Sequence, residues 1–488
     1  MNLREVARAQ PEHDSSDSSH NLKQMGILEF LGNAFQITIL MYFALINTFH
    51  AASLYMGALG MNRALRRGNV SIKDLLEREV YKPVSILVPA YNEQETIAAS
   101  VNSFLNLHYP EFEVVVINDG SKDNTIEVLK ETYDLVEIPK ITRFEIKTSE
   151  IKAAYRSPKY PNMIVVDKAN GGKADALNVG LIHSRYPLFC AVDADSLLEA
   201  KSLLRATRAF VEDDSIVAIG CTIRVLNGAT LDRGVITDLR APSGWVERFQ
   251  VLEYLRAFLV GRLMWGNLGM LLIISGAFGI FRRDMVLRLG GYRTDTVGED
   301  MELAVRLHAA ARASGKPYKI LYTVDPICWT QVPSDWKTLR KQRNRWQRGL
   351  WETLINHKVM LLNPKYGRLG MVAIPYFWLL EALSPALEVG GYVYVLFSAL
   401  AGQLNVPFAT AFAALAILYG SLLSMAAIWA EGLLPTRYER LSDRLILLLA
   451  SVVESVGYRQ GLAWVRFHAG LTVSQQRGKW GSMVRKKI

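Results

Sequence analysis

Cysteine is scarce in this chain of 488 residues, which contains only Cys190, Cys221 and Cys328. Their wide separation matches neither a dense disulfide framework nor the close spacing of a cysteine-rich metal site. A disulfide-stapled scaffold is therefore excluded, and we expect three reduced, structural thiols, as in a cytosolic domain. The sequence also lacks internal repeats, which excludes solenoid and propeller architectures.

Charged residues are also few, at 21% of the chain, whereas hydrophobic residues make up 50% and the mean hydropathy is +0.12. That mean is high for a soluble enzyme, and the length favours two or more structural bodies. The net charge of +10 suits either nucleic acid or an anionic membrane surface. Because the apolar residues are concentrated toward the two ends, we expect a lipid bilayer and no nucleic acid among the partners.

The N-terminal region combines a polar tail with a long apolar segment. Residues 1–24 are polar and are expected to be disordered. Residues 26–60 are long and apolar enough to span a bilayer, and they begin too late and run too long for a signal peptide. Basic residues follow them at Arg63, Arg66, Arg67 and Lys73. The positive-inside rule therefore places the N-terminus outside and the next domain in the cytosol.

Residues 80–335 alternate apolar runs with helical patterns, which predicts an α/β domain. The predicted strands cover 84–89, 114–121, 163–167 and 189–196, and the predicted helices cover 94–107, 174–183 and 301–311. The apolar stretch 260–281 is long enough to span a membrane, but Arg262 interrupts it and a renewed α/β pattern follows. We therefore place this stretch inside the domain, with its start touching the membrane face.

The segments after the α/β domain are expected to meet the membrane in different ways. Residues 336–362 are basic, aromatic and amphipathic, which suits the headgroup layer. Residues 369–430 contain two apolar stretches, which predict two transmembrane helices. Residues 444–470 are weaker because charges interrupt them, so we expect the segment 444–488 to be interfacial or re-entrant and to end in a basic cytosolic tail.

The predicted strand 189–196 ends in two carboxylates, Asp193 and Asp195. In an extended strand these side chains would share a face, at the carboxyl edge where open α/β sheets bind ligands. Two hard oxygen ligands there suit Mg²⁺ or Mn²⁺, with substrate phosphates completing the shell. The alternative is a turn in which Asp195 or Ser196 caps a helix that starts near Leu197.

Short motifs follow one another in order along the domain. They are Pro89-Ala90-Tyr91-Asn92-Glu93, Asp119-Gly120-Ser121, Gly171-Gly172-Lys173-Ala174, Asp193-Ala194-Asp195, Gly298-Glu299-Asp300 and Gln342-Arg343-Asn344-Arg345-Trp346. Each is weak alone, but together they resemble the membrane-bound, processive members of glycosyltransferase family 2, such as the synthases of cellulose, hyaluronan, chitin and poly-N-acetylglucosamine. The resemblance covers roughly residues 80–350. That family usually has Thr where this chain has Gly298, which leaves the acid pair intact.

The resemblance implies a GT-A (Rossmann-like) α/β fold that binds a nucleotide sugar and inverts its anomeric carbon. Tyr91 would stack on uracil, with Glu93 and Asp119 as hydrogen-bond acceptors. Taken alone, Tyr91 is equally consistent with an ordinary half-buried tyrosine. Residues 171–172, likewise, form a Gly-Gly pair typical of a simple tight turn.

The leaving UDP carries two phosphates, which need positive charge as they depart. Lys173, Arg345 and a bound Mg²⁺ or Mn²⁺ would provide it. Asp195 would hold the cation, and Asp193 would contact either the cation or the ribose.

The acceptor half requires a base and a platform. Asp300 is the expected general base, with Glu299 orienting it. The same pair would also suit the first turn of a helix, where acids favour the dipole. Trp346 offers an aromatic face to the acceptor sugar, and Ser275 with Gly276 lets the backbone approach closely.

Gln342, Arg345 and Trp346 are spaced i, i+3 and i+4, so they share a helix face. We expect most other arginines between residues 340 and 348 to be solvated or lipid-facing.

These observations favour a multi-pass cell-membrane enzyme that extends a β-linked glycan from a UDP-sugar and feeds it into the membrane. A small membrane partner or a homo-oligomer would complete an export path, because the predicted spans are few. One alternative is transfer of a single sugar to a lipid acceptor. Another is a non-enzymatic membrane adaptor regulated by nucleotide, against which the complete acidic motifs argue.

Overall fold

The structure is a computed structural model that describes residues 15–68, 81–140, 146–232, 235–434 and 438–475. Its centre is a ten-stranded mixed sheet with the strand order β3-β4-β5-β2-β1-β6-β11-β8-β12-β7, and a separate hairpin pairs β9 with β10. The strands are β1 (Val84–Ala90), β2 (Phe112–Asp119), β3 (Val136–Ile138), β4 (Ile151–Arg156), β5 (Met163–Lys168), β6 (Leu188–Ala191), β7 (Ser196–Leu198), β8 (Ile216–Val225), β9 (Ala229–Asp232), β10 (Val235–Leu239), β11 (Gly279–Arg282) and β12 (Lys319–Thr330).

The neighbouring strands β5, β2, β1 and β6 are parallel. They are almost wholly buried apolar runs, which is the pattern of a parallel sheet covered on both faces. Because they are parallel, their carboxyl ends meet at one edge, and the loops that follow them lie together there. The strands predicted within 84–89, 114–121 and 163–167 are confirmed, whereas the last predicted strand ends early, at Ala191.

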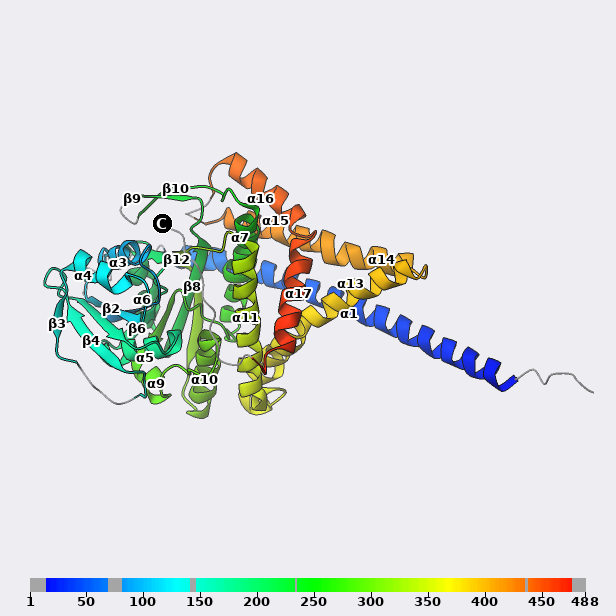
Figure 1. Ribbon diagram of the computed structural model, residues 1–488, viewed down its shortest axis with the longest axis horizontal. Helices are drawn as coiled ribbons and strands as arrows, with labels where there is room; N and C mark the ends of the chain where they lie inside the picture. Colours follow the sequence, from blue (N-terminus) through cyan, green and yellow to red (C-terminus); the bar gives the residue numbers. More distant parts are fainter. Residues whose placement is uncertain (1–14, 69–80, 141–145, 233–234, 435–437, 476–488) are drawn as a thin grey trace, which may run out of the picture.

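Helices pack on this sheet: α5 lies against β1 and β2, and α6 lies against β8 and β12 (Figure 1). The helices of this part are α3 (Ile97–Leu105), α4 (Thr125–Tyr133), α5 (Lys173–His183), α6 (Ser202–Glu212), α7 (Trp245–Tyr254), the π-helical η1 (Leu255–Gly261), α8 (Arg262–Asn267), α9 (Arg283–Arg288), α10 (Glu299–Ala313) and α11 (Trp336–Asn356). The stretch 260–281 ends inside the sheet as β11, between β6 and β8, which confirms its placement within the domain.

Helix α11 lies between the sheet and the long apolar helices (Figure 1). The expectation that most of its arginines are solvated or lipid-facing is wrong for Arg343 and Arg348, which are 3% and 5% exposed. Both find partners inside the protein. The Arg343 guanidinium donates to Glu253 (2.6 Å) and to Gln342 (2.5 Å), and Arg348 donates to Asn344 (3.0 Å).

Three helices are long and apolar enough to cross a membrane: Glu29–Met61 within α1, Leu369–Leu400 and Val406–Glu431. They coincide with the apolar segments predicted from the sequence. Helix α1 (Ser15–Gly68) extends beyond the tip where α13 and α14 meet (Figure 1). The remaining elements here are η4 (Leu369–Ala373), α12 (Ile374–Tyr376), η5 (Phe377–Ala382), α13 (Ser384–Leu400), α14 (Val406–Ala413), η6 (Ala414–Leu418) and α15 (Tyr419–Glu431).

The predicted disordered tail is corrected in part, because α1 begins at Ser15 and residues 15–24 are helical. The long apolar span that follows lets the helix propagate toward its N-terminus. Residues 1–14 lie outside the described residues, as does the basic tail at 476–488.

Two helices, α16 (Leu441–Val453) and α17 (Tyr458–Leu471), form a pair bent by 57°. At the bend, fully buried Glu454 accepts hydrogen bonds from Arg256 of η1 (2.5 Å), Arg459 (2.8 Å) and Ser424 (2.6 Å). The bend is therefore tied to the α/β domain by charged contacts. By length and composition the pair is either one broken span or a re-entrant segment, so the interfacial prediction for 444–470 stays a prediction.

Candidate active site

The predicted site residues gather at the carboxyl edge of the parallel strands. Tyr91 follows β1, Asp119 ends β2, Lys173 begins α5 after β5, and Asp193 follows β6. The loops touch: a Cβ on Gly120, whose φ is +64°, would lie 2.7 Å from the backbone nitrogen of Asn170. A glycine is therefore needed there both for its backbone conformation and for space.

Asp119 fastens the glycine turn to the sheet. Its carboxylate accepts the backbone N–H groups of Gly171 (2.9 Å) and Gly172 (2.8 Å), and it is only 3% exposed. Lys168, also fully buried, donates to the same carboxylate at 2.5 Å and pairs with Asp175 at 2.7 Å. Burial raises the pKa of Asp119, against the opposing pull of the Lys168 ammonium. These bonds hold the turn that delivers Lys173, and the uracil contact expected of Asp119 stays a prediction.

Tyr91 and Glu93 differ in their solvent exposure. Tyr91 is 38% exposed at the end of β1, as a stacking surface must be. Glu93 is buried at 7%, and its carboxylate accepts the hydroxyl of Thr96 at 2.7 Å, beside the start of α3. The structure therefore gives Glu93 a place in the loop's own architecture, and its contact with uracil also stays a prediction.

Lys173 lies between the Asp193 loop and the first turn of α10, which carries Glu299. Its ammonium contacts the Asp193 carboxylate, lies 3.4 Å from the carbonyl oxygen of Gly276 and lies 3.9 Å from Oε1 of Glu299. A Cβ on Gly276 would lie 2.6 Å from this ammonium, so a larger residue there would displace the end of the Lys173 side chain. Burial alone would lower the pKa of Lys173, but the carboxylates of Asp193, Glu299 and Asp300 outweigh it and raise the pKa.

The two acids after β6 do not share a strand face. The chain turns after Ala191, with the N–H of Ser196 donating to the carbonyl of Asp193 at 3.0 Å. The Asp193 side chain is 30% exposed, whereas Asp195 is buried at 2%. The strand-face argument is therefore wrong, because β6 ends before the acids. The helix-cap alternative is also wrong, because Ser196–Leu198 is the strand β7.

No cluster of three or more metal-ligating side chains occurs among the described residues. Asp193 and Asp195 nevertheless supply two carboxylates at the edge where a diphosphate would lie. That donor set fits Mg²⁺ or Mn²⁺ of the kind that proteins hold through one or two carboxylates, the substrate phosphates and water. In this structure Asp193 is paired with Lys173, so a cation would share that carboxylate with the ammonium.

The second acidic pair opens helix α10, as expected. Asp300 accepts the N–H of Met301 at 2.7 Å, and Glu299 is 5% exposed. Burial raises the pKa of Glu299 to about 7, against the opposing effect of Lys173. A pocket opens beside these acids, and it is lined by Leu177, Ala191, Ile274, Ser275, Gly276, Phe281, Tyr292, Glu299 and Asp300. The structure therefore brings Ser275 and Gly276 to the same pocket as the predicted base.

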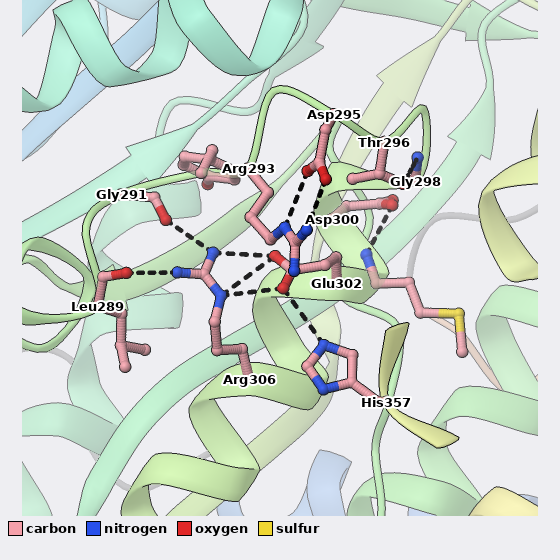
Figure 2. Close-up of polar contacts among 12 residues, drawn as sticks. Leu289, Gly291, Arg293, Asp295, Thr296, Gly298, Asp300, Glu302, Arg306 and His357 are labelled. Carbon is pink, nitrogen blue, oxygen red and sulfur yellow. Dashed lines mark hydrogen bonds and ion pairs between the residues drawn. The ribbon is translucent and has the colours of Figure 1, made fainter. Parts of the chain in front are cut away.

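Behind this pair lies a cluster that the sequence reasoning missed (Figure 2). Fully buried Glu302 pairs with Arg306 at 2.9 Å and contacts His357 at 3.3 Å, while Arg306 also donates to the carbonyls of Leu289 (2.6 Å) and Gly291 (2.7 Å). Burial favours a higher pKa for Glu302, but the bonds from His357 and Arg306 outweigh it and lower the pKa. The i, i+4 spacing of Glu302 and Arg306 is the signal that predicts this pair.

Helix α11 carries the three predicted residues Gln342, Arg345 and Trp346, which differ in their exposure. Trp346 is 40% exposed, and the Arg343 guanidinium lies 4.2 Å from the centroid of its ring. Gln342 is buried at 7% and accepts from Arg343, whereas Arg345 is half-buried, with a charge that acts to lower the pKa of Glu299. Of Gln342, Arg345 and Trp346, Trp346 is therefore the most exposed to solvent.

Comparisons with known proteins identify the family of this chain. The sequence model of "Glycosyltransferase like family 2" matches residues 82–349. The poly-beta-1,6-N-acetyl-D-glucosamine synthase of Staphylococcus epidermidis is 26% identical over 335 residues, which cover 66% of this chain and 70% of that protein. The enzyme of the same name from Staphylococcus aureus is 28% identical over 275 residues, covering 56% and 55%.

Among solved structures, the mannosyltransferase PcManGT from Pyrobaculum calidifontis, in complex with GDP-Man and Mn²⁺, superposes with a TM-score of 0.52 at 19% identity, covering 86% of this chain and 99% of that one. This likeness shows the fold, which is the expected GT-A-like mixed α/β sheet. The family match extends over more than half of the chain, from β1 to the middle of α11. The chain is therefore a glycosyltransferase and belongs to glycosyltransferase family 2.

Proposed function

We propose that this protein is a membrane-integrated, inverting glycosyltransferase that adds sugars from a UDP-sugar to a growing β-linked polysaccharide. The observation that carries the proposal is the meeting of Lys173, Asp193 and Glu299 beside a pocket lined by Asp300. The similarity to poly-beta-1,6-N-acetyl-D-glucosamine synthases supports a polymer product, and the three long apolar helices support membrane integration.

The donor would lie along the carboxyl edge of the sheet. The exposed ring of Tyr91 suits stacking on the base, and the positive charges of Lys173 and Arg345 suit the diphosphate. Asp195 and Asp193 would hold Mg²⁺ or Mn²⁺, which when bound supplies further positive charge for the leaving UDP. As the nucleotide enters, Lys173 would exchange part of its pairing with Asp193 for the phosphate oxygens.

The acceptor would approach from the side of α10 and α11. Its hydroxyl oxygen forms a bond to the anomeric carbon while the bond from that carbon to UDP breaks, and the electron pair leaves with UDP. The hydroxyl proton goes to the Asp300 carboxylate. Attack from the face opposite the leaving group inverts the anomeric carbon. Trp346 would hold the acceptor sugar on its exposed ring face.

The proposed orientation places the catalytic domain in the cytosol, the N-terminus outside and Asn405 outside, with α16 and α17 lying at the interface. The exposed side chain of Asn405 at the start of α14 makes it a suitable labelling position. Cysteine accessibility scanning tests this arrangement, since external labelling at residue 482 would give a fourth full span. With few spans, a small membrane partner or a second copy would complete an export path.

The deciding experiment incubates the membrane-reconstituted protein with a panel of UDP-sugars and Mg²⁺ or Mn²⁺, and follows UDP release, product size and linkage. A β-linked polymer is expected. A product that carries one sugar on lipid would replace the polymer proposal with a lipid glycosyltransferase. Absence of UDP release from every donor would contradict the proposed function.

A further inference from the structure

A buried glutamate of α11 grips the loop that carries the catalytic acids. Oε2 of Glu352 accepts the hydroxyl of Thr296 (2.8 Å) and the backbone N–H of Val297 (2.8 Å). The Thr296 oxygen in turn accepts the N–H of Gly298 at 3.2 Å. Glu352 is 3% exposed and Thr296 is 1% exposed. The three loop residues immediately precede Glu299 and Asp300, so this clamp ends where the catalytic helix begins.

Two glycines bring the same loop into backbone contact with α11. A Cβ on Gly298 would lie 2.8 Å from the Cα of Gly349, and a Cβ on Gly349 would lie 2.7 Å from the Cα of Gly298. No side chain fits between these backbones. The contact also accounts for the departure from the family motif, because a threonine in place of Gly298 would collide with α11.

The clamp and the acceptor platform share one helix. Positions 342, 345, 349 and 352 follow one another at intervals of three or four residues along α11, so they lie on one face. The helix thus carries the proposed platform in one turn and the grip on the acids in later turns. Because one helix carries both Trp346 and Glu352, it fixes the distance between the proposed base and the acceptor sugar.

We propose that Glu352 is a positioning residue, which sets Asp300 against the sugar held at Trp346. This rests on the proposed function. The loop is the part that Glu352 controls, because α10 and α11 have a second, independent contact at Glu302 and His357 (3.3 Å) (Figure 2). Loss of the clamp would loosen residues 296–300 while the two helices stay packed.

The test compares Glu352→Ala with Glu352→Gln. The amide oxygen of glutamine accepts the same two hydrogen bonds, so Gln should retain transfer within about threefold of wild type. Alanine removes both bonds, and kcat for transfer should fall about 10- to 100-fold, because displacements near 1 Å at a reacting centre cost this much. The KM for the UDP-sugar and the affinity for UDP should stay within about threefold, since the donor side is untouched.

Glu113→Ala is the matched control. Oε1 of Glu113 accepts the hydroxyl of Ser85 (2.6 Å) and the backbone N–H of Arg185 (2.8 Å), which is the same pair of hydrogen bonds at the opposite edge of the sheet, and Oε2 also pairs with the Arg185 guanidinium (3.2 Å). This variant should lose stability and keep kcat per folded molecule. An equal fall in kcat for both alanine variants would make Glu352 a merely structural residue, as would a parallel collapse of UDP affinity in Glu352→Ala.

Hydrogen exchange at residues 297–300 gives a readout that does not depend on activity. Exchange there should accelerate in Glu352→Ala and not in Glu352→Gln or Glu113→Ala. If the wild type released no UDP but exchange changed in this way, the proposed function would fail while the clamp stood. Unchanged exchange would overturn the clamp whatever the activity. Should Glu352→Ala not fold, Thr296→Val removes one of the two donors and carries the same test.

Discussion

Two carboxylate networks meet at the same edge of the sheet, and their surroundings differ. Asp119 is 3% exposed and is enclosed by Lys168 and the Gly171–Gly172 backbone. Asp193 pairs with Lys173 while its side chain stays 30% exposed, close to Glu299 and the pocket. A buried network such as that of Asp119 stabilises the loop it is part of. A partly exposed network such as that of Asp193 can exchange protein partners for a ligand. We therefore expect substitutions in the first to cost stability and substitutions in the second to cost activity.

The largest expected effect is that of Asp195→Asn, which keeps the shape of the side chain and removes a proposed metal carboxylate. Turnover should be abolished, because the lost stabilisation of the leaving group is on the order of several kcal/mol. UDP release with Mg²⁺ or Mn²⁺ measures it. Asp214→Asn, an exposed site paired with Lys82, should retain activity as a control. Full turnover of Asp195→Asn in EDTA-treated buffer would rule out the metal assignment.

Asp300→Asn should come next. Removal of the general base should reduce transfer by about 10²- to 10⁴-fold and leave UDP binding nearly intact. Titration with UDP and steady-state transfer rates separate the two quantities. If UDP affinity fell as far as the rate, Asp300 would be a binding residue and the base would lie elsewhere.

Asp119→Asn against Asp193→Asn tests the comparison itself. The first leaves buried Lys168 with Asp175 as its one remaining carboxylate, and it should lower the free energy of unfolding by about 3 kcal/mol. The second acts on a partly exposed pair and should cost under about 1 kcal/mol. Denaturant unfolding of both variants in detergent measures the difference. Equal losses of stability in the two variants would contradict the distinction between a structural network at Asp119 and a functional network at Asp193.

The smallest expected effect concerns pH. The pKa of Glu299 is raised to about 7, so ionised Glu299 should become available to Lys173 as the pH rises through that value. The kcat/KM should rise with an inflection near pH 7, which Glu299→Gln should remove. The sign for stability is opposite: the native state retains a proton that the unfolded chain releases near 4.5, so this group's contribution falls between about pH 4.5 and 7. An inflection that survives Glu299→Gln would assign it to another group.

Much of the sheet could be predicted from sequence, because buried parallel strands such as β1 and β2 are predominantly apolar, with Val, Ile and Leu at most positions. The short antiparallel strand β7 could not, since its three residues follow a turn that resembled a helix cap. The motifs also identified residues that do converge, notably Lys173, Asp193 and Glu299. For Lys173 and Asp193 the order of motifs along the chain was enough, because both follow strands of the parallel part of the sheet, whose carboxyl ends meet at one edge. Glu299 instead opens α10 after the antiparallel strand β11, so only the resemblance indicated its place in the site.

The rest depends on contacts between distant residues. The basic sequence around Arg343 predicted a solvent-exposed side chain. Its burial could not be predicted, because its partner Glu253 lies far away in the sequence, in α7. The role of Glu352 could not be predicted from sequence, because a single acid on a basic helix is common. Its importance follows only from the hydrogen bond that Thr296, far away in the sequence, donates to it. The grip of Asp119 on the glycine turn was likewise invisible, since both residue types had functional explanations of their own.

The most direct test of the central claim measures UDP release and polymer mass on the same preparation of wild type and Trp346→Ala. Trp336→Ala, a similarly exposed tryptophan on α11, is the control. The wild type and the control should make polymer in proportion to UDP released. Trp346→Ala should keep UDP affinity within a few-fold, lose polymer and still release some UDP by hydrolysis, because the sugar platform is gone and the donor site remains. Polymer of wild-type length from Trp346→Ala would contradict the platform, and absence of polymer from the wild type would contradict the account.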